Sequence, residues 1–357
     1  MKSTGFTKSL VLVVGAGASK EVDLPLGAEL KGAIATALDI RYENGHRRVS
    51  GDGLIDEAFR TLARSLPAPR TNDINPFLHS SRHIAGAMPQ ALSIDNFIES
   101  HRGDESIALC GKLAIVRAIL DAEKRSKLYV DRRKSYNTLN FADVEATWFN
   151  AFFQLVTENC HKDEIAARLS QVAIVTFNYD RCIEHYLHAS LQNYYRMSAD
   201  ESTKALESLN IYHPYGTVGQ LEWQSPKAGI AFGGELDAQK LIQLAGGIRT
   251  FTEGIDPKLG ESNAIRTALS HARRIAFLGF AFHRLNLELL FDGGPFESDA
   301  RDCPVYATSL GLSKADVEVI ALQLAKLGNF RHDSFRLLNQ LRCSELLREY
   351  WRSLSLS

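Results

Sequence analysis

Short apolar runs rich in β-branched residues recur along the chain, and each is followed by small or polar residues and then by a helix-compatible segment. The first two runs are 10–14 and 172–177, and two more, 274–279 and 304–308, lie in the last third of the chain. Continuous apolar runs of this length are typical of parallel strands that are buried on both faces. The pattern therefore predicts an α/β protein built on a parallel sheet.

The stretch between the first two runs has the spacing of helices instead. Apolar residues at 109, 113, 116 and 120 fall on one helical face, and the aromatic residues of 148–153 do the same. These patterns predict a helical insertion over 41–168. The sheet domain is then expected from 1–40 and 169–330, with a C-terminal helix over 331–357.

Composition sets broad limits on the function. The chain has 357 residues, of which 45% are hydrophobic, so it can bury a sizeable core. Its net charge of −1 gives no reason to expect direct nucleic-acid binding, and the basic run 124–134 is interrupted by acidic residues, as in a solvated loop. The first apolar run is too short for a membrane span or a signal peptide. We expect a cytoplasmic protein with no membrane partner.

The cysteines do not indicate a disulfide framework or a zinc site. They are five in number, scattered, and never arranged as C-x-x-C pairs. We expect reduced, partly buried thiols.

A glycine turn follows the first apolar run and reads Gly15-Ala16-Gly17-Ala18-Ser19. Glycine allows backbone angles closed to other residues and lets a ligand approach, and the helix beyond offers free N–H groups to a phosphate. The third glycine of the usual dinucleotide fingerprint is replaced by Lys20. The turn alone therefore fits a nucleotide site and an ordinary turn before a core helix equally well.

Polar residues follow two further predicted strands. Asn178 and Asp180 come directly after the second apolar run, where open α/β sheets bind their ligands, although either side chain could simply cap the next helix. His213 and Tyr215 belong to a short extended piece and would share one face of it. His213 could be a general base or a hydrogen-bonded structural residue.

Taken together and in this order, five short motifs resemble the sirtuin-like family, and more narrowly its bacterial NAD-hydrolysing branch, found in anti-phage defence systems. The motifs are GAGAS at 15–19, SIDNFIE at 93–99, TFNYD at 176–180, HPYG at 213–216 and FLGFAFH at 277–283. The resemblance spans 11–309. It implies a Rossmann-like sheet domain interrupted by a second, helical lobe.

The resemblance also implies the site residues. Asn178 takes the position of the family's catalytic asparagine, and His213 stands two residues before the position of its histidine, which Tyr215 holds. The remaining residues are expected to contact NAD, from pyrophosphate to adenosine, and they are Gly15, Ala16, Gly17, Ser19, Asp180, Tyr215, Gly279, Phe280, Thr308 and Ser309.

Two departures separate the chain from the sirtuin deacylases. It lacks their zinc module of paired cysteines, and 24–27 reads LPLG where they carry an arginine. The resemblance therefore implies an NAD hydrolase, with NAD as substrate and no metal, that depletes NAD in antiviral defence by abortive infection.

The chemistry of NAD cleavage fits the same residues. Nicotinamide in NAD is already a cationic leaving group on the ribose, so cleavage passes through an oxocarbenium-like state. Asn178 offers a donor and an acceptor for ribose hydroxyls or the attacking water, and His213 could take a proton. The products would be ADP-ribose and nicotinamide. The alternative is a non-catalytic module that senses NAD or ADP-ribose and needs no base.

The sequence carries no motif that identifies a partner. Only C-terminal helices remain after the sirtuin-like region. We therefore expect control in trans, by a homo-oligomer or by a second defence protein such as a DNA-translocating ATPase or a nucleotide-processing partner.

Overall fold

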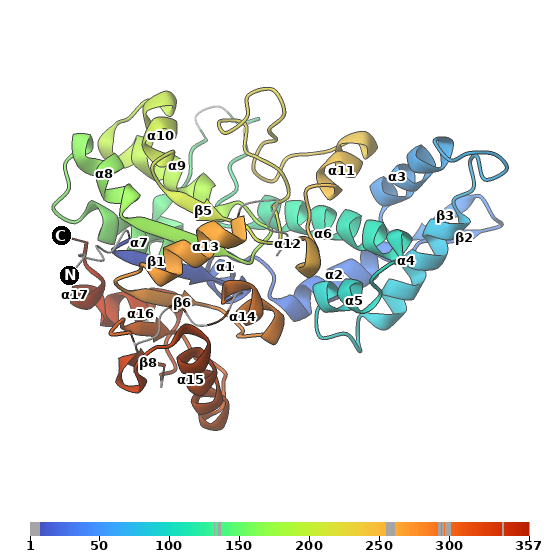
Figure 1. Ribbon diagram of the computed structural model, residues 1–357. Helices are drawn as coiled ribbons and strands as arrows, with labels where there is room; N and C mark the ends of the chain where they lie inside the picture. The colour runs from blue at the N-terminus through green and yellow to red at the C-terminus, as the bar shows by residue number, and fades with distance from the viewer. Residues whose placement is uncertain are drawn as a thin grey trace.

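The computed structural model describes residues 8–131, 133–134, 137–254, 261–291, 294, 296, 301–337 and 339–356. The start of the predicted sheet domain, 1–7, lies outside these ranges. Six parallel strands form one sheet in the order β5-β4-β1-β6-β7-β8 (Figure 1). They are β1 (Leu10–Val14), β4 (Val172–Thr176), β5 (Asn210–Tyr212), β6 (Ile275–Leu278), β7 (Val305–Ala307) and β8 (Phe335–Arg336). Counted along the chain within this sheet, the order is 3-2-1-4-5-6, so the α/β prediction is confirmed and the sheet is Rossmann-like.

The first apolar run becomes the central strand. β1 pairs in parallel with β4, from Leu10 beside Val172 onward, and with β6, from Val11 beside Ile275 onward. Every residue of β1 is fully buried. Leu10 and Leu12 face one hydrophobic core while Val11 and Val13 face the other, which is why the run shows no alternation of polar residues.

Helices cover both faces of the sheet. Those that pack into the core of Leu10 and Leu12 are α7 (Trp148–Thr157), α8 (Ile165–Ser170), α9 (Cys182–Tyr195), α10 (Ala199–Leu206), α16 (Cys343–Glu349) and α17 (Trp351–Leu354). Those on the opposite face are α12 (Phe251–Gly254), α13 (Glu261–Ser270), α14 (Arg284–Leu290) and α15 (Lys314–Gly328). Short turns complete the layers, namely α1 (Ala16–Ser19) and the 3-10 turns η1 (Lys20–Val22), η2 (Phe141–Val144), η3 (Lys162–Glu164) and η5 (His332–Ser334).

A helical lobe extends from one end of the sheet domain (Figure 1). Its members are α2 (Gly27–Leu38), α3 (Gly53–Arg64), α4 (Asn75–Ala87), α5 (Ile94–Ser100), α6 (Glu105–Arg125), α11 (Ala238–Ala245) and the hairpin of β2 (Arg41–Glu43) and β3 (Arg47–Ser50). The long helix α6 packs against α2, α4 and α11. The lobe therefore draws α2 from the 1–40 segment and α11 from the 169–330 segment, while α7 of the 41–168 segment packs on the sheet.

The C-terminal segment is not the single helix that the sequence predicts over 331–357. Phe335 and Arg336 pair with β7 and add the last strand to the sheet. The two helices that follow begin at Cys343 and Trp351. A strand of two residues is too short to show the alternation of apolar and polar residues that is typical of a strand. In the sequence, Phe335 is therefore indistinguishable from the apolar residues of the helical pattern that follows it.

Candidate functional site

The strand order reverses between β1 and β6, and in open α/β sheets ligands bind outside the carboxyl ends of the strands at such a point. The loops that follow these two strands are hydrogen-bonded to each other. The amide of Gly15 donates to the carbonyl of Leu278 at 3.0 Å, and the amide of Gly17 donates to the carbonyl of Gly279 at 3.0 Å. We call these two joined loops the switch-point loops.

Close packing of backbone on backbone explains the glycines of the switch-point loops. A Cβ at Gly15 would lie 2.6 Å from the carbonyl oxygen of Gly279. A Cβ at Gly17 would lie 2.8 Å from the Cα of Gly279. Gly279 itself has φ +58°, and a Cβ there would lie 2.1 Å from the amide nitrogen of Ala18. All three positions thus require glycine before any ligand is considered. Ala16, between the two glycines, opens the single turn of α1.

Asn178 follows β4 and reaches back to the first glycine turn. Its side-chain NH₂ donates to the carbonyl of Gly15 at 3.2 Å and to the hydroxyl of Ser19 at 2.9 Å. Within the described ranges its side-chain oxygen accepts no hydrogen bond, and that atom keeps some contact with solvent. The two donors are therefore fixed, and the acceptor is free for a ligand.

Asp180 contacts the same glycine turn through Ser19. Its carboxylate accepts the amide of Cys182 at 3.1 Å, at the start of α9, and it is hydrogen-bonded to the hydroxyl of Ser19. Burial raises the pKa of Asp180, and the hydrogen bonds from Cys182 and Ser19 offset only part of this rise. Asp180 therefore makes the helix-capping contact and also ties α9 to the glycine turn.

His213 lies behind Asn178 and is paired with Glu184 of α9. Its Nε2 is 2.7 Å from Glu184 Oε1, and its Nδ1 is 3.4 Å from the backbone oxygen of Asn178. Burial alone would lower the pKa of His213, but the charge and hydrogen bond of Glu184 outweigh it and the pKa is raised. For Glu184 burial acts to raise the pKa, yet the charge of His213 prevails and the pKa is lowered. The two groups therefore stabilise each other in their charged forms.

Tyr215 points to a different partner, and the expectation that it shares a face with His213 is wrong. Residues 213–216 form a turn, closed by the amide of Gly216 donating to the carbonyl of His213 at 2.9 Å, so the two side chains are not two steps apart on a strand. The Tyr215 hydroxyl donates to Asn286 Oδ1 at 2.7 Å. Burial raises the pKa of Tyr215 well above its ordinary value, so its phenol stays neutral.

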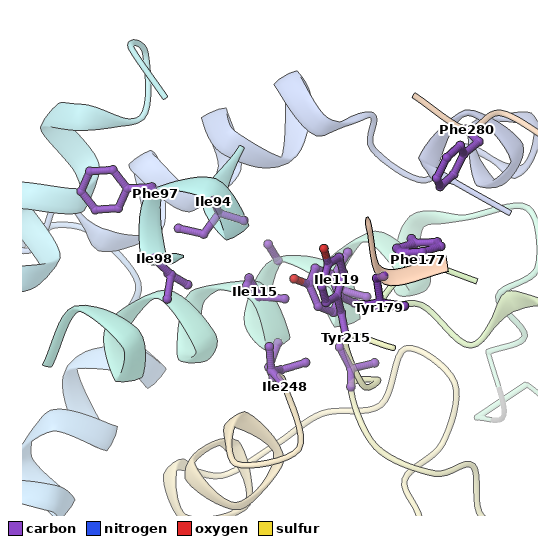
Figure 2. Close-up of a cluster of buried hydrophobic side chains, with 14 of the residues drawn as sticks. Ile94, Phe97, Ile98, Ile115, Ile119, Phe177, Tyr179, Tyr215, Ile248 and Phe280 are labelled. Atoms are coloured by element: carbon purple, nitrogen blue, oxygen red, sulfur yellow. The ribbon is translucent and has the colours of Figure 1, made fainter. Parts of the chain in front are cut away.

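A cluster of buried aromatic and aliphatic side chains joins the switch-point loops to the helical lobe (Figure 2). Phe280 lies with its ring centroid 5.2 Å from that of Phe177, and Phe177 meets the ring of Tyr215 edge-on at 5.6 Å. On the lobe side the cluster includes Ile94, Phe97 and Ile98 of α5 and Ile115 and Ile119 of α6.

A polar contact accompanies this packing. The hydroxyl of Tyr179 donates to the carboxylate of Asp95 in α5. The lobe thus packs against the carboxyl edge of the sheet through apolar side chains and through carboxylates, which include Asp95 of α5 and Glu123 of α6, the ion-pair partner of Arg181.

Thr308 and Ser309 stabilise the neighbouring loops. The hydroxyl of Thr308 accepts the amide of Gly279 at 2.8 Å and so holds the second switch-point loop. The hydroxyl of Ser309 donates to the carbonyl of Leu337 at 2.7 Å, in the segment after β8. Both residues are buried. The structure therefore brings Thr308 to the site and ties Ser309 to the far edge strand.

No protein-family model and no curated protein sequence matches this chain. The cysteines are free thiols. Of the helices in the described part of the chain, none combines the length and the apolar character that crossing a lipid bilayer requires.

Sequence reasoning missed Glu184 and Tyr179 as members of this site. Glu184 lies in the helix after TFNYD, where its spacing indicates only an amphipathic helix, and Tyr179 lies inside that motif. Asp95 lies in the SIDNFIE motif, but the sequence assigns it no part in the site. The signal for all three is contact between distant segments, which one sequence does not reveal.

Proposed function

We propose that this chain binds NAD at the carboxyl edge of its sheet and hydrolyses the nicotinamide–ribose bond, giving ADP-ribose and nicotinamide. The orientation of Asn178 is the observation that carries the proposal. Its NH₂ group is held by Gly15 and Ser19, so within the described part of the chain its side-chain oxygen is left as an acceptor without a hydrogen bond. The switch-point position and the resemblance of TFNYD to the sirtuin-like motif support the same assignment.

The reaction needs little more than positioning. The C1′–N bond breaks with its electron pair going to the ring nitrogen, so nicotinamide leaves neutral and requires no general acid. The amide oxygen of Asn178 would accept a hydrogen bond from a ribose hydroxyl or from the attacking water, and its partial negative charge would favour the oxocarbenium-like state. Water then bonds to C1′ and releases one proton to the solvent.

The direct test compares Asn178→Ala with the parent for release of nicotinamide and ADP-ribose, followed by chromatography. We expect turnover to fall by about a hundredfold or more, as when a preorganised polar group is removed from a reaction centre. Asn193→Ala, on the exposed surface of α9, is the matched control and should retain activity. Full turnover in the Asn178→Ala variant would refute the assignment.

The cellular role is proposed from the resemblance alone. We propose that NAD depletion acts in anti-phage defence, with control in trans by self-association or by a second protein. NAD should then be measured in cells that express the chain with its genomic neighbours, with and without phage. Depletion that is lost in the Asn178→Ala variant would support this role, and unchanged NAD in both states would contradict it.

A second candidate is a module that binds NAD or ADP-ribose without turnover. The position of His213 favours it, because both of its ring nitrogens face oxygen acceptors and neither is directed to a substrate. Calorimetric titration with NAD, analysed for products afterwards, separates the two candidates. Binding without nicotinamide release, in the presence of the genomic neighbours, would favour the sensor.

A further inference from the structure

The ion pair behind Asn178 contains a histidine whose two ring nitrogens both face oxygen atoms. Nε2 is 2.7 Å from Glu184 Oε1, and Nδ1 is 3.4 Å from the backbone oxygen of Asn178. An imidazole satisfies two acceptors only when both nitrogens carry hydrogen, which is the imidazolium form. The geometry therefore favours a cationic His213.

Burial makes this pairing obligatory for Glu184. The side chains of His213 and Glu184 are only 12% and 7% exposed. The second carboxylate oxygen of Glu184 is fully buried and has no hydrogen-bond partner in the described chain. A buried carboxylate that lacks other donors depends strongly on its one cation, so the two residues are expected to keep their charges together.

The surroundings of the ring reinforce its positive charge. Asp180, two residues before α9, also raises the pKa of the ring, after the larger contributions of burial, Glu184 and the backbone carbonyl of Asn178. The guanidinium of Arg181, whose charge also acts on Glu184, is bound to Glu123 and to the carbonyls of Ile230 and Ala231. It is therefore not available to replace His213 beside Glu184.

We propose that Glu184 is a positioning residue that keeps His213 protonated, so that the imidazolium holds the backbone carbonyl of Asn178 and fixes the direction of the Asn178 side chain. This inference rests on the proposed function and assigns His213 a part other than general base. A ring that carries both protons has no lone pair with which to take another.

The two roles of His213 predict opposite pH dependence. A general base works when it is deprotonated, so kcat would rise as the pH increases through the pKa of His213. A positioning imidazolium works when it is protonated, so kcat would fall through the same pKa. Replacing Glu184 by Gln removes the charge that sustains the imidazolium, and the falling limb should move to lower pH.

The ring can be observed without any assay of activity. In the full chain labelled with ¹⁵N, the two ring nitrogens of His213 should both report bound hydrogen at pH 7.5, with the signals assigned by their loss in His213→Gln. In Glu184→Gln the pKa of His213 should fall by about one unit or more. Glu207→Gln, at an exposed position after α10, is the control and should leave it unchanged.

The activity measurement completes the test. We expect Glu184→Gln to lower kcat for NAD by about tenfold to a hundredfold, with a smaller change in KM, because misplacement affects the reacting geometry more than binding. A neutral His213 ring in the parent at pH 7.5 would overturn the inference, and so would a kcat that rises through its pKa. If the chain releases no nicotinamide even in the presence of its genomic neighbours, the proposed function fails, while the ring measurement still decides whether Glu184 keeps His213 protonated.

Discussion

The contact between the switch-point loops predicts a large loss of stability for Gly279→Ala. The new methyl group would lie 2.1 Å from the amide nitrogen of Ala18, whereas ordinary contacts begin near 3.4 Å, so the loops must separate by about 1 Å. That separation breaks the 3.0 Å hydrogen bond from Gly17 to Gly279, worth about 1 kcal/mol. An alanine at φ +58° adds about 1 kcal/mol more. With overpacking, the expected loss is about 3–5 kcal/mol.

Urea denaturation followed by far-ultraviolet circular dichroism measures this loss. With a slope of about 3 kcal/mol per molar urea, the midpoint should fall by about 1 M or more. Gly32→Ala is the matched control, because Gly32 lies in the interior of α2 with nothing near its Cα face, and alanine there should raise stability by about 1 kcal/mol. An unchanged midpoint for Gly279→Ala would refute the close backbone contact.

Two further predictions concern buried charge. Arg181→Met leaves the Glu123 carboxylate buried without its cation and should lower the free energy of unfolding by about 3–5 kcal/mol in urea denaturation. Adding Glu123→Leu should restore part of this loss, and a double variant whose loss equals the sum of the two single losses would contradict the prediction. The Glu184–His213 pair should stabilise the fold most between about pH 4.5 and 6.5. The pKa of His213 is raised on folding, so its contribution to stability is complete below its ordinary pKa of 6.5 and is lost as the pH rises through its pKa in the folded chain. The pKa of Glu184 is lowered on folding, so its contribution is complete above its ordinary pKa of 4.5 and is lost as the pH falls through its pKa in the folded chain. A parent-minus-His213→Gln stability difference that is flat with pH would contradict it.

The fold could be predicted from the sequence where the apolar pattern is continuous. The runs that became β1, β4, β6 and β7 are buried on both faces, and burial of every residue leaves an unmistakable pattern. Phe335 and Arg336 of β8 were missed because pairing with a neighbouring strand, rather than local preference, defines so short an element. The lobe shows the same limit, since α11 joins it through contacts with α3 and α6, which lie far from it in the sequence.

The candidate site was predictable as a set of loops but not as a set of contacts. Parallel strands present their carboxyl ends at one edge, so Asn178 and the glycine turn had to lie near each other. Which atoms of Asn178 are engaged depends on Ser19 and Gly15, more than 150 residues away in the chain. The pairing of His213 with Glu184 likewise spans two elements, and only their packing reveals it.

The missing third glycine has a physical reason in the structure. In a dinucleotide fingerprint the third glycine allows a long helix to pack closely on the first strand. Here α1 is a single turn, η1 follows it, and the chain turns away at Asp23, which has φ +71°. Lys20 at that position points to the surface and pairs with Glu29 at 2.7 Å. No helix needs to approach β1 at this point, so the requirement for glycine ends at Gly17, and the departure from the fingerprint follows from the short helix rather than from the absence of a ligand site.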